Sequence, residues 1–165
     1  MRVPYVLKGP AHGDIVRVFP DAPDNFKPEI KIAIRHKDNK LKCFALIDSG
    51  ADSCLFPKGM ADALGINLRS GSRITLVGIG KQNVHFYFHE IEIFVGKYKF
   101  KTMAGFADGE IGTSALLGQR GFFENFVVSF DRKNRFIEIR KSNIIDSLVS
   151  NLFSSRILSK LKLSD

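Results

Sequence analysis

Apolar and polar residues alternate along most of the chain, and this pattern predicts strands. Ile30, Ile32 and Ile34 alternate with Lys31, Ala33 and Arg35. This period of two is typical of a half-buried strand. The apolar run 41–47 returns after a polar turn, so residues 29–47 form a predicted hairpin. Further strands are predicted at 15–19, 74–77, 84–88, 91–95, 98–106, 115–117, 127–130 and 135–140. Because 84–88 and 91–95 alternate out of phase, we expect a β-bulge near residues 89–90.

Helical patterns are confined to short stretches. Pro57 opens a predicted helix, and Gly65 stands where a left-handed C-cap is expected. A second short helix is predicted soon after Gly118. The fold class is therefore mainly all-β: an N-terminal arm at 1–28 with one strand in it, a β domain at 29–141 and a helical basic tail at 142–165.

The tail carries apolar residues at helical spacing and basic residues between them. Such an amphipathic helix could lie on a membrane, pack on a partner subunit or cover the domain's own core. Eight Lys or Arg and three Asp or Glu lie between Arg132 and Asp165. Much of the net charge of +8 therefore belongs to this end of the chain.

Composition and charge narrow the function classes. A chain of 165 residues is long enough for one domain with a real core. The positive charge raises the hypothesis of nucleic acid or an anionic surface as partner, but no aromatic stacking motif for RNA is evident, so we do not expect nucleic acid. No apolar run approaches the roughly 20 residues that span a bilayer, and the N-terminal residues lack the apolar core of a signal peptide, so we predict no transmembrane segment.

The cysteines and histidines carry no site of their own. Cys43 and Cys54 are too few for a disulfide framework and are interpreted as reduced, buried thiols of a cytoplasmic protein. His85 and His89 have no acid or third ligand grouped with them. We therefore predict no metal and no cofactor.

The stretch 45–53 holds the clearest candidate chemistry. An apolar strand ends on Asp48, and Ser49-Gly50 forms the predicted sharp turn after it. A carboxylate at the end of a buried strand is costly unless it is paired or its pKa moves. Asp48 could simply cap the next turn through its side chain, or it could be held at the floor of a cleft for acid–base chemistry.

Three motifs in one order resemble the retroviral-type aspartic peptidases (retropepsins) and their bacterial relatives. Ile47-Asp48-Ser49-Gly50-Ala51-Asp52 resembles the catalytic loop, Val77-Gly78-Ile79-Gly80 the flap, and Leu116-Leu117-Gly118 the strand that crosses behind the catalytic loop. The resemblance covers roughly residues 29–141. It implies a retropepsin-like acid-protease β-barrel.

The same resemblance implies the roles of single residues. Asp48 would be the catalytic acid, and the chain has no other Asp-Ser-Gly or Asp-Thr-Gly, so the enzyme would be a homodimer with one Asp48 from each copy. Ser49 would bond across the dimer axis, and Gly50 would accept a substrate amide, with Ala51 completing the loop. The extended polypeptide substrate would be bound by Asp52 and by the flap residues, which are Val77, Gly78, Ile79 and Gly80.

Two departures keep alternatives open. Retroviral enzymes commonly place Arg directly after the Leu-Leu-Gly glycine, where it pairs with the acid matched to Asp52; here Gln119 stands there and Arg120 follows. A helical tail also follows the last strand. A non-catalytic binding or scaffold module with the same fold, or a nucleic-acid or membrane-surface binder that acts through the basic tail, are the alternative functions.

Overall fold

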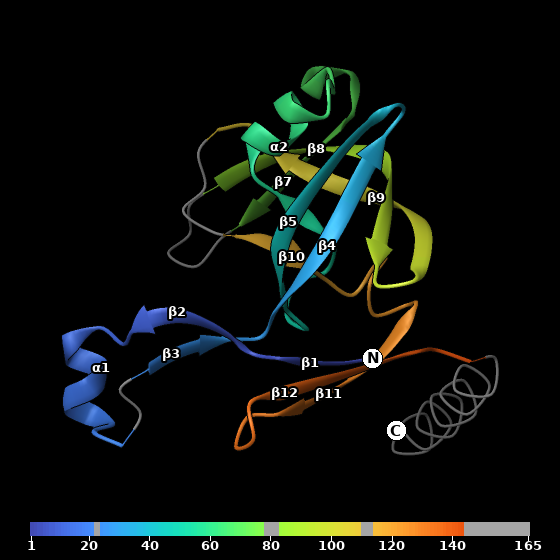
Figure 1. Ribbon diagram of the computed structural model, residues 1–165. Coiled ribbons are helices and arrows are strands. Elements are labelled where there is room, and N and C mark those ends of the chain that lie inside the picture. The colour runs from blue at the N-terminus through green and yellow to red at the C-terminus, as the bar shows by residue number, and fades with distance from the viewer. Residues whose placement is uncertain (22–23, 78–82, 110–113, 144–165) are drawn as a thin grey trace, which may run out of the picture.

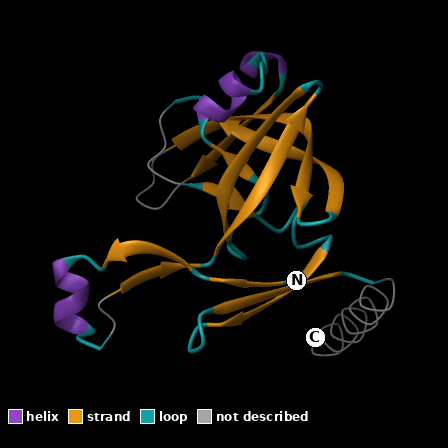
Figure 2. Cartoon of the chain, viewed as in Figure 1, coloured by secondary structure: helices purple, strands orange, loops and turns teal. Residues whose placement is uncertain are grey.

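The computed structural model describes residues 1–21, 24–77, 83–109 and 114–143. Strands make up most of this part, and its helices are short (Figure 2). In chain order the elements are β1 (Arg2–Pro4), β2 (Val6–Pro10), α1 (Gly13–Val18), β3 (Asp24–Lys27), β4 (Glu29–His36), β5 (Asn39–Ile47), β6 (Leu55–Phe56), α2 (Lys58–Ala63), the 3-10 helix η1 (Leu68–Ser70), β7 (Ser72–Val77), β8 (Asn83–Val95), β9 (Tyr98–Ala107), β10 (Ala115–Leu117), β11 (Phe126–Asp131) and β12 (Phe136–Lys141). The predicted all-β class is confirmed.

Six strands close into a barrel. Their order is β4-β5-β10-β6-β9-β8, and β8 pairs back onto β4 (Figure 1). β7 adds to the first half of β8, on the edge that faces away from β9. The predicted hairpin at 29–47 is confirmed as β4 and β5, with Ile34 paired with both Leu41 and Ile93. Closure gives each ring strand a neighbour on both sides, and the interior holds fully buried apolar side chains, among them Phe56 and Phe106.

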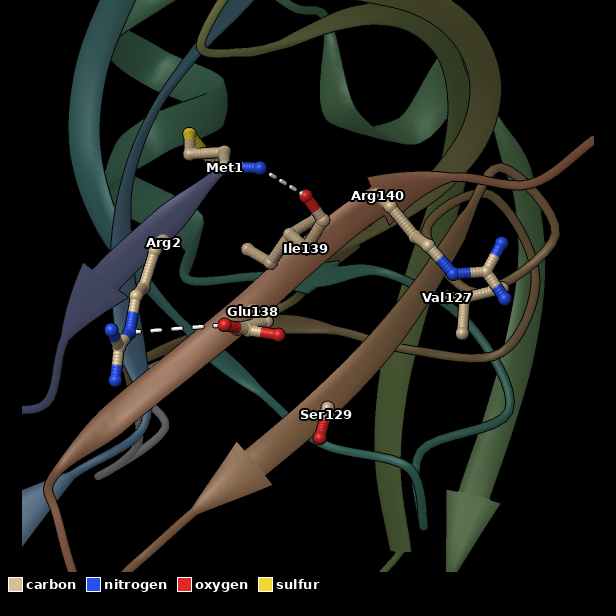
Figure 3. Close-up of a pocket in the computed structure, with 7 residues that line it drawn as sticks. All are labelled: Met1, Arg2, Val127, Ser129, Glu138, Ile139 and Arg140. Atoms are coloured by element: carbon tan, nitrogen blue, oxygen red, sulfur yellow. Dashed lines mark hydrogen bonds and ion pairs between the residues drawn. The ribbon is translucent and has the colours of Figure 1, made fainter.

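A separate sheet of three strands lies below the barrel, in the order β1-β12-β11 (Figure 1). The main-chain nitrogen of Met1 donates to the Ile139 carbonyl at 2.6 Å, and the Ile139 nitrogen donates to the Met1 carbonyl at 2.8 Å. Arg2 and Glu138 form an ion pair at 3.8 Å across the same two strands (Figure 3). The first strand thus packs against the last described one.

The next segment differs from the extended arm that the sequence predicted. β2 and β3 pair with each other in a two-stranded sheet, and residues 13–18 form helix α1, so the predicted strand at 15–19 is wrong. The His12 side chain accepts a hydrogen bond from the Asp14 nitrogen, and Asp14 lies in the first turn, where a negative charge favours a helix. These local helix signals outweigh the strand preference of Ile and Val.

The predicted bulge at 89–90 is also wrong. β8 and β9 pair in unbroken register from Phe86–Ala107 to Val95–Tyr98. The buried side chains change phase because the neighbours of β8 change along its length. β7 pairs with its first half, whereas β4 pairs with residues 92–94 of its second half.

The helical predictions have mixed outcomes. Pro57 is the N-cap of α2, and Gly65 follows its end with a φ of 63°, as predicted. Residues 119–125 form turns and an isolated bridge instead of the helix predicted after Gly118. The predicted helical tail at 142–165 lies, from residue 144 onward, outside the described part. No helix among the described residues is long and apolar enough to cross a membrane.

Candidate active site

Asp48 directly follows β5 and is partly buried. β5 pairs in parallel with β10, with Ile47 opposite Leu117. The ladder continues one residue further, because the Asp48 nitrogen donates to the Leu117 carbonyl at 3.1 Å. The main chain of Asp48 is therefore fixed by a strand from the second half of the molecule.

The Asp48 side chain contributes to the turn that follows it. Its Oδ1 accepts a hydrogen bond from the Gly50 nitrogen at 2.9 Å, and its carbonyl accepts one from the Ala51 nitrogen at 3.2 Å. The turn-capping interpretation is thus correct for one oxygen. Within the described residues, the other oxygen, Oδ2, has no hydrogen-bond partner. Capping and acid–base chemistry are therefore compatible at this residue.

The loop after Asp48 is held by the segment that follows β10. The Gln119 nitrogen donates to the Ala51 carbonyl at 2.8 Å, and the Arg120 nitrogen donates to the Asp52 carbonyl at 3.0 Å. The Gln119 side chain adds a third bond, from Nε2 to the Ser49 carbonyl at 2.6 Å. Three carbonyls of the loop are thus fixed by two consecutive residues.

Gly118 allows this close approach. A Cβ at this position would lie 2.3 Å from the Ser53 carbonyl oxygen and 2.5 Å from that of Ala51. Those contacts are shorter than non-bonded atoms tolerate, and both are with backbone. Any side chain at Gly118 would push the loop away from the strand behind it.

An open groove of about 980 Å³ lies beside the loop. Gly50, Ala51, Asp52 and Ser53 line one part of it. Apolar side chains from four strands line much of the rest, and they are Leu55, Ile74, Leu76, Phe88 and Met103. A groove with main-chain groups along one side and apolar walls can hold a polypeptide in extended form.

Comparison with solved structures identifies this architecture. A retropepsin-like aspartic protease from Rickettsia conorii superimposes with a TM-score of 0.52 at 18% identity, over 68% of this chain and 89% of that one. The retroviral protease-like domain of Ddi1 from Leishmania major gives 0.51 at 17% identity, over 71% and 90%. The chain has the retropepsin-like fold. No protein-family model and no curated protein matches the sequence.

β7 and β8 form an antiparallel hairpin on either side of the segment predicted as the flap tip. They pair from Ser72–Phe88 to Val77–Asn83. The tip, which includes Gly78, Ile79 and Gly80, lies outside the described residues. The hairpin is confirmed, and the roles of these tip residues stay predictions.

Asp52 is exposed and lines the groove. Within the described residues its carboxylate makes no ion pair, and it is the Asp52 main chain that contacts Arg120. Gln119, which stands where retroviral enzymes commonly place Arg, bonds the loop carbonyl of Ser49 instead. The sequence noted this departure without predicting what Gln119 does.

Sequence reasoning also missed Glu29. This carboxylate is buried at the start of β4, where Oε2 lies 2.5 Å from Lys8 Nζ and Oε1 accepts a hydrogen bond from Ser114 Oγ at 3.4 Å. Glu29 pairs with Leu46, two residues before Asp48. Because Glu29 opens a strand that also carries Lys31 and Arg35, its burial had no local signal in the sequence.

The remaining candidates in the retropepsin-like fold have other contacts. His85 Nδ1 lies 3.0 Å from Thr75 Oγ1, and His89 Nε2 lies 2.8 Å from the Leu68 carbonyl. The described ranges contain no group of three or more side chains suited to hold a metal. Cys43 and Cys54 are free thiols, and burial raises the pKa of each to about 11.

Proposed function

We propose that this chain is an aspartic endopeptidase that works as a homodimer. The observation that carries the proposal is the placement of Asp48. Its main chain is fixed by Leu117, one of its carboxylate oxygens caps its own turn, and its loop borders an open groove. The retropepsin-like fold supports an aspartic-protease kind of function.

The proposal requires two copies of the chain. Aspartic peptidases use two carboxylates a few ångströms apart, and Asp48 belongs to the only Asp-Ser-Gly or Asp-Thr-Gly of the sequence. A twofold axis beside the loop would bring the Asp48 residues of two copies together, since an isologous contact repeats the same surface on each subunit.

The chemistry follows from two acids sharing one proton. Like charges at short range do not both ionise, so one carboxyl keeps its proton while the other is ionised. The ionised acid accepts a proton from a water molecule, which attacks the scissile carbonyl. The protonated acid hydrogen-bonds that carbonyl and later protonates the leaving amine. No covalent intermediate with the enzyme forms.

The substrate class follows from the groove. An extended polypeptide would lie between the loop and the flap, with Gly50 and Asp52 bonding its main chain and the flap covering it. The apolar walls at Leu55, Ile74 and Leu76 favour apolar side chains beside the cut. A peptide library in which charged residues are preferred there would refute this specificity.

The proposal is tested by sedimentation equilibrium and a peptide-library cleavage assay on the same samples. The wild type should be dimeric and cleave peptides. Asp48→Asn should be dimeric and inactive, because an amide cannot replace the shared proton. Asp62→Asn, which changes an exposed acid on α2, should cleave like the wild type. Cleavage by Asp48→Asn would refute the assignment.

A second candidate is a non-catalytic binding module with the same fold. It is favoured by the Asp52 carboxylate, which makes no ion pair within the described residues, and by Gln119 at the position where retroviral enzymes commonly place Arg. A wild type that binds peptides in the groove and leaves them intact would support it. A cytoplasmic location and a basic tail that binds anionic surfaces stay predictions from the sequence.

A further inference from the structure

The clasp, defined here as the described residues 6–21 and 24–27, projects away from the barrel (Figure 1). It consists of β2, α1 and β3. Apolar side chains stand exposed along it, with 53% of Leu7, 49% of Ile15, 64% of Val18 and 57% of Phe19 accessible. A concentration of exposed apolar side chains on a small projecting element is typical of an interaction surface.

The clasp makes few contacts that would stabilise it within one chain. β2 and β3 form a two-stranded sheet that pairs with no other described strand, and α1 has no buried residue. An isolated two-stranded hairpin is marginally stable in water, and a helix of six residues is far shorter than one that is stable alone. A second surface is therefore needed to cover the clasp.

The root of the clasp is firmly attached beside the candidate active site. The Ile47 nitrogen donates to the Pro28 carbonyl at 2.9 Å, so the chain leaves the clasp directly behind the Asp48 loop. Lys8 on β2 pairs with buried Glu29 on β4. The Arg135 guanidinium lies 4.1 Å from the ring centre of Phe26 on β3. These contacts fix the direction in which the clasp leaves the barrel.

We propose that the clasp docks on a second copy of this chain and stabilises the homodimer. The inference rests on the proposed function, because a dyad of two Asp48 residues places the partner against the loop from which the clasp departs. β2 alone has five residues, which at roughly 3.3 Å per residue extend about 16 Å from the root. That reach carries α1 onto a subunit that abuts the Asp48 loop.

Twofold symmetry makes the contact reciprocal. Each copy extends its clasp over the other, and the apolar side chains of α1 become buried at both ends of the dimer. The occupant of this apolar surface is thus the body of the partner subunit. If the tests below show no contact with a second copy, the surface is left to a different protein or an anionic membrane.

The first test compares dimer dissociation constants by sedimentation equilibrium, using purified protein alone. The variant Ile15→Ser/Val18→Ser/Phe19→Ser removes the apolar face of the clasp, and Phe44→Ser is the control, since Phe44 on β5 is 49% exposed as Ile15 is. The dissociation constant of the triple variant should rise at least tenfold, and that of the control should not change. At protein concentrations that restore the dimer, the triple variant should cleave peptides like the wild type.

Failure of this inference is distinct from failure of the proposed function. A triple variant that dimerises as tightly as the wild type, in a protein that cleaves peptides, overturns the clasp and leaves the peptidase intact. A wild type that is monomeric and inactive overturns both proposals.

The second test needs no destabilising change. A photoreactive phenylalanine analogue is placed at position 19 of the otherwise wild-type chain. Irradiation of the dimer should then cross-link two chains, whereas the same analogue at position 44 should not. Cross-links from position 19 that stay within one chain would overturn the proposal.

Discussion

Gln119 donates a hydrogen bond from Nε2 to the main-chain carbonyl of Ser49 at 2.6 Å. This contact joins the segment after β10 to the residue next to the candidate catalytic acid. It is also the contact made by the side chain that stands where retroviral enzymes commonly place Arg. The position of the loop therefore depends on an amide donor.

Removing that donor should loosen the loop. Gln119→Ala is expected to lower the free energy of unfolding by about 1 kcal/mol, the usual net contribution of one hydrogen bond, and to lower kcat more than it raises KM, because the acid is less well positioned. Gln119→Glu is the sharper variant, since a carboxylate cannot donate to the Ser49 carbonyl and should be no better than Ala. Wild-type values for both variants in denaturant unfolding and steady-state kinetics would contradict the role of Gln119.

A methyl group at Gly118 should displace the loop. Its Cβ would lie 2.3 Å from the Ser53 carbonyl oxygen, and we expect Gly118→Ala to cost about 2–3 kcal/mol of stability, as overpacking does, and to abolish cleavage. The matched control is Gly59→Ala on α2, where a Cβ meets nothing within 4 Å. Because Ala is preferred to Gly in helices, the control should be neutral or about 0.5–1 kcal/mol more stable. Equal unfolding midpoints for the two variants would refute the close approach.

Cys54 should give the protein an alkaline dependence of stability. Burial raises the pKa of this thiol from 9.0 to about 11. The folded state therefore holds its proton between those values while the unfolded state loses it, so the contribution is complete below pH 9 and is lost as the pH rises toward 11. The loss from this residue is at most about 3 kcal/mol. Unfolding of wild type and Cys54→Ala from pH 8 to 11 checks it: the variant should show the flatter profile, and parallel profiles would contradict the prediction.

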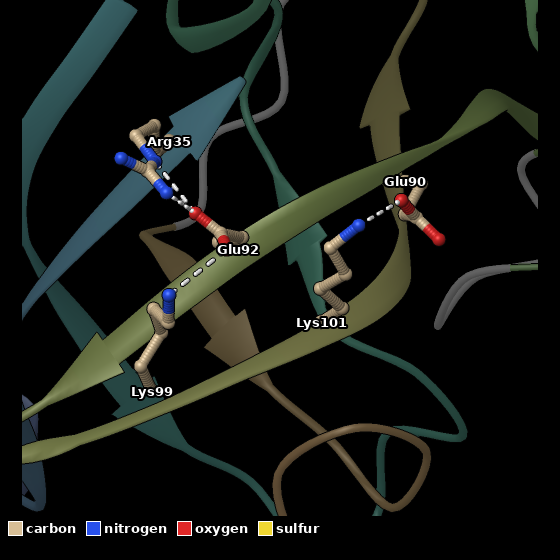
Figure 4. Close-up of polar contacts among 5 residues, drawn as sticks. All are labelled: Arg35, Glu90, Glu92, Lys99 and Lys101. Carbon is tan, nitrogen blue, oxygen red and sulfur yellow. Dashed lines mark hydrogen bonds and ion pairs between the residues drawn. The ribbon is translucent and has the colours of Figure 1, made fainter. Parts of the chain in front are cut away.

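An ion pair on the barrel should make the stability of the protein depend on pH in the acidic range. Arg35 Nε donates to Glu92 Oε2 at 2.5 Å, and Lys99 lies 3.4 Å from Oε1 (Figure 4). The Arg35 hydrogen bond is the main cause that lowers the pKa of Glu92. The stabilisation is therefore present above the ordinary pKa of about 4.5 and is lost as the pH falls through the lower folded value.

Glu92→Gln should make the midpoint temperature of thermal unfolding less dependent on pH below pH 5. Glu90→Gln is the control, since the pair of Glu90 and Lys101 is largely exposed on both sides and such pairs contribute little. If the pH dependence of the midpoint below pH 5 changes equally in both variants, the predicted role of Glu92 is wrong.

The sequence predicted the barrel strands well because their alternation is a local signal. The hairpin around residues 29–47 and the C-cap at Gly65 follow from turn chemistry and from period, and both are confirmed. Helix α1 was missed because Ile15, Val16 and Val18 favour strands on average, whereas capping at His12 decides the local outcome. The phase change in β8 depends on which strands lie beside it, and no window of the sequence carries that information.

The candidate site also has parts that the sequence predicted and parts that it did not. The strand that ends on Asp48 and the Gly118 strand were visible as motifs, and the structure brings them into contact. The contact of Gln119 with Ser49 joins residues 70 positions apart, and the pair of Lys8 and Glu29 joins the clasp to the barrel. Such long-range partners depend on the fold and have no local signature.

The parallel pairing of β10 beside β5 has a consequence for how the chain matures. Residues 45–47 pair with the start of β4 on one edge, but they receive their partner on the other edge from residues 115–117. Closing a loop of that length is slow relative to forming the local hairpins. On a ribosome, the β4–β5 hairpin can form long before β10 emerges. The Asp48 loop therefore lacks the contacts that hold it during most of synthesis. A chain cut short before Gln119 would retain the β4–β5 hairpin but would have no ordered site.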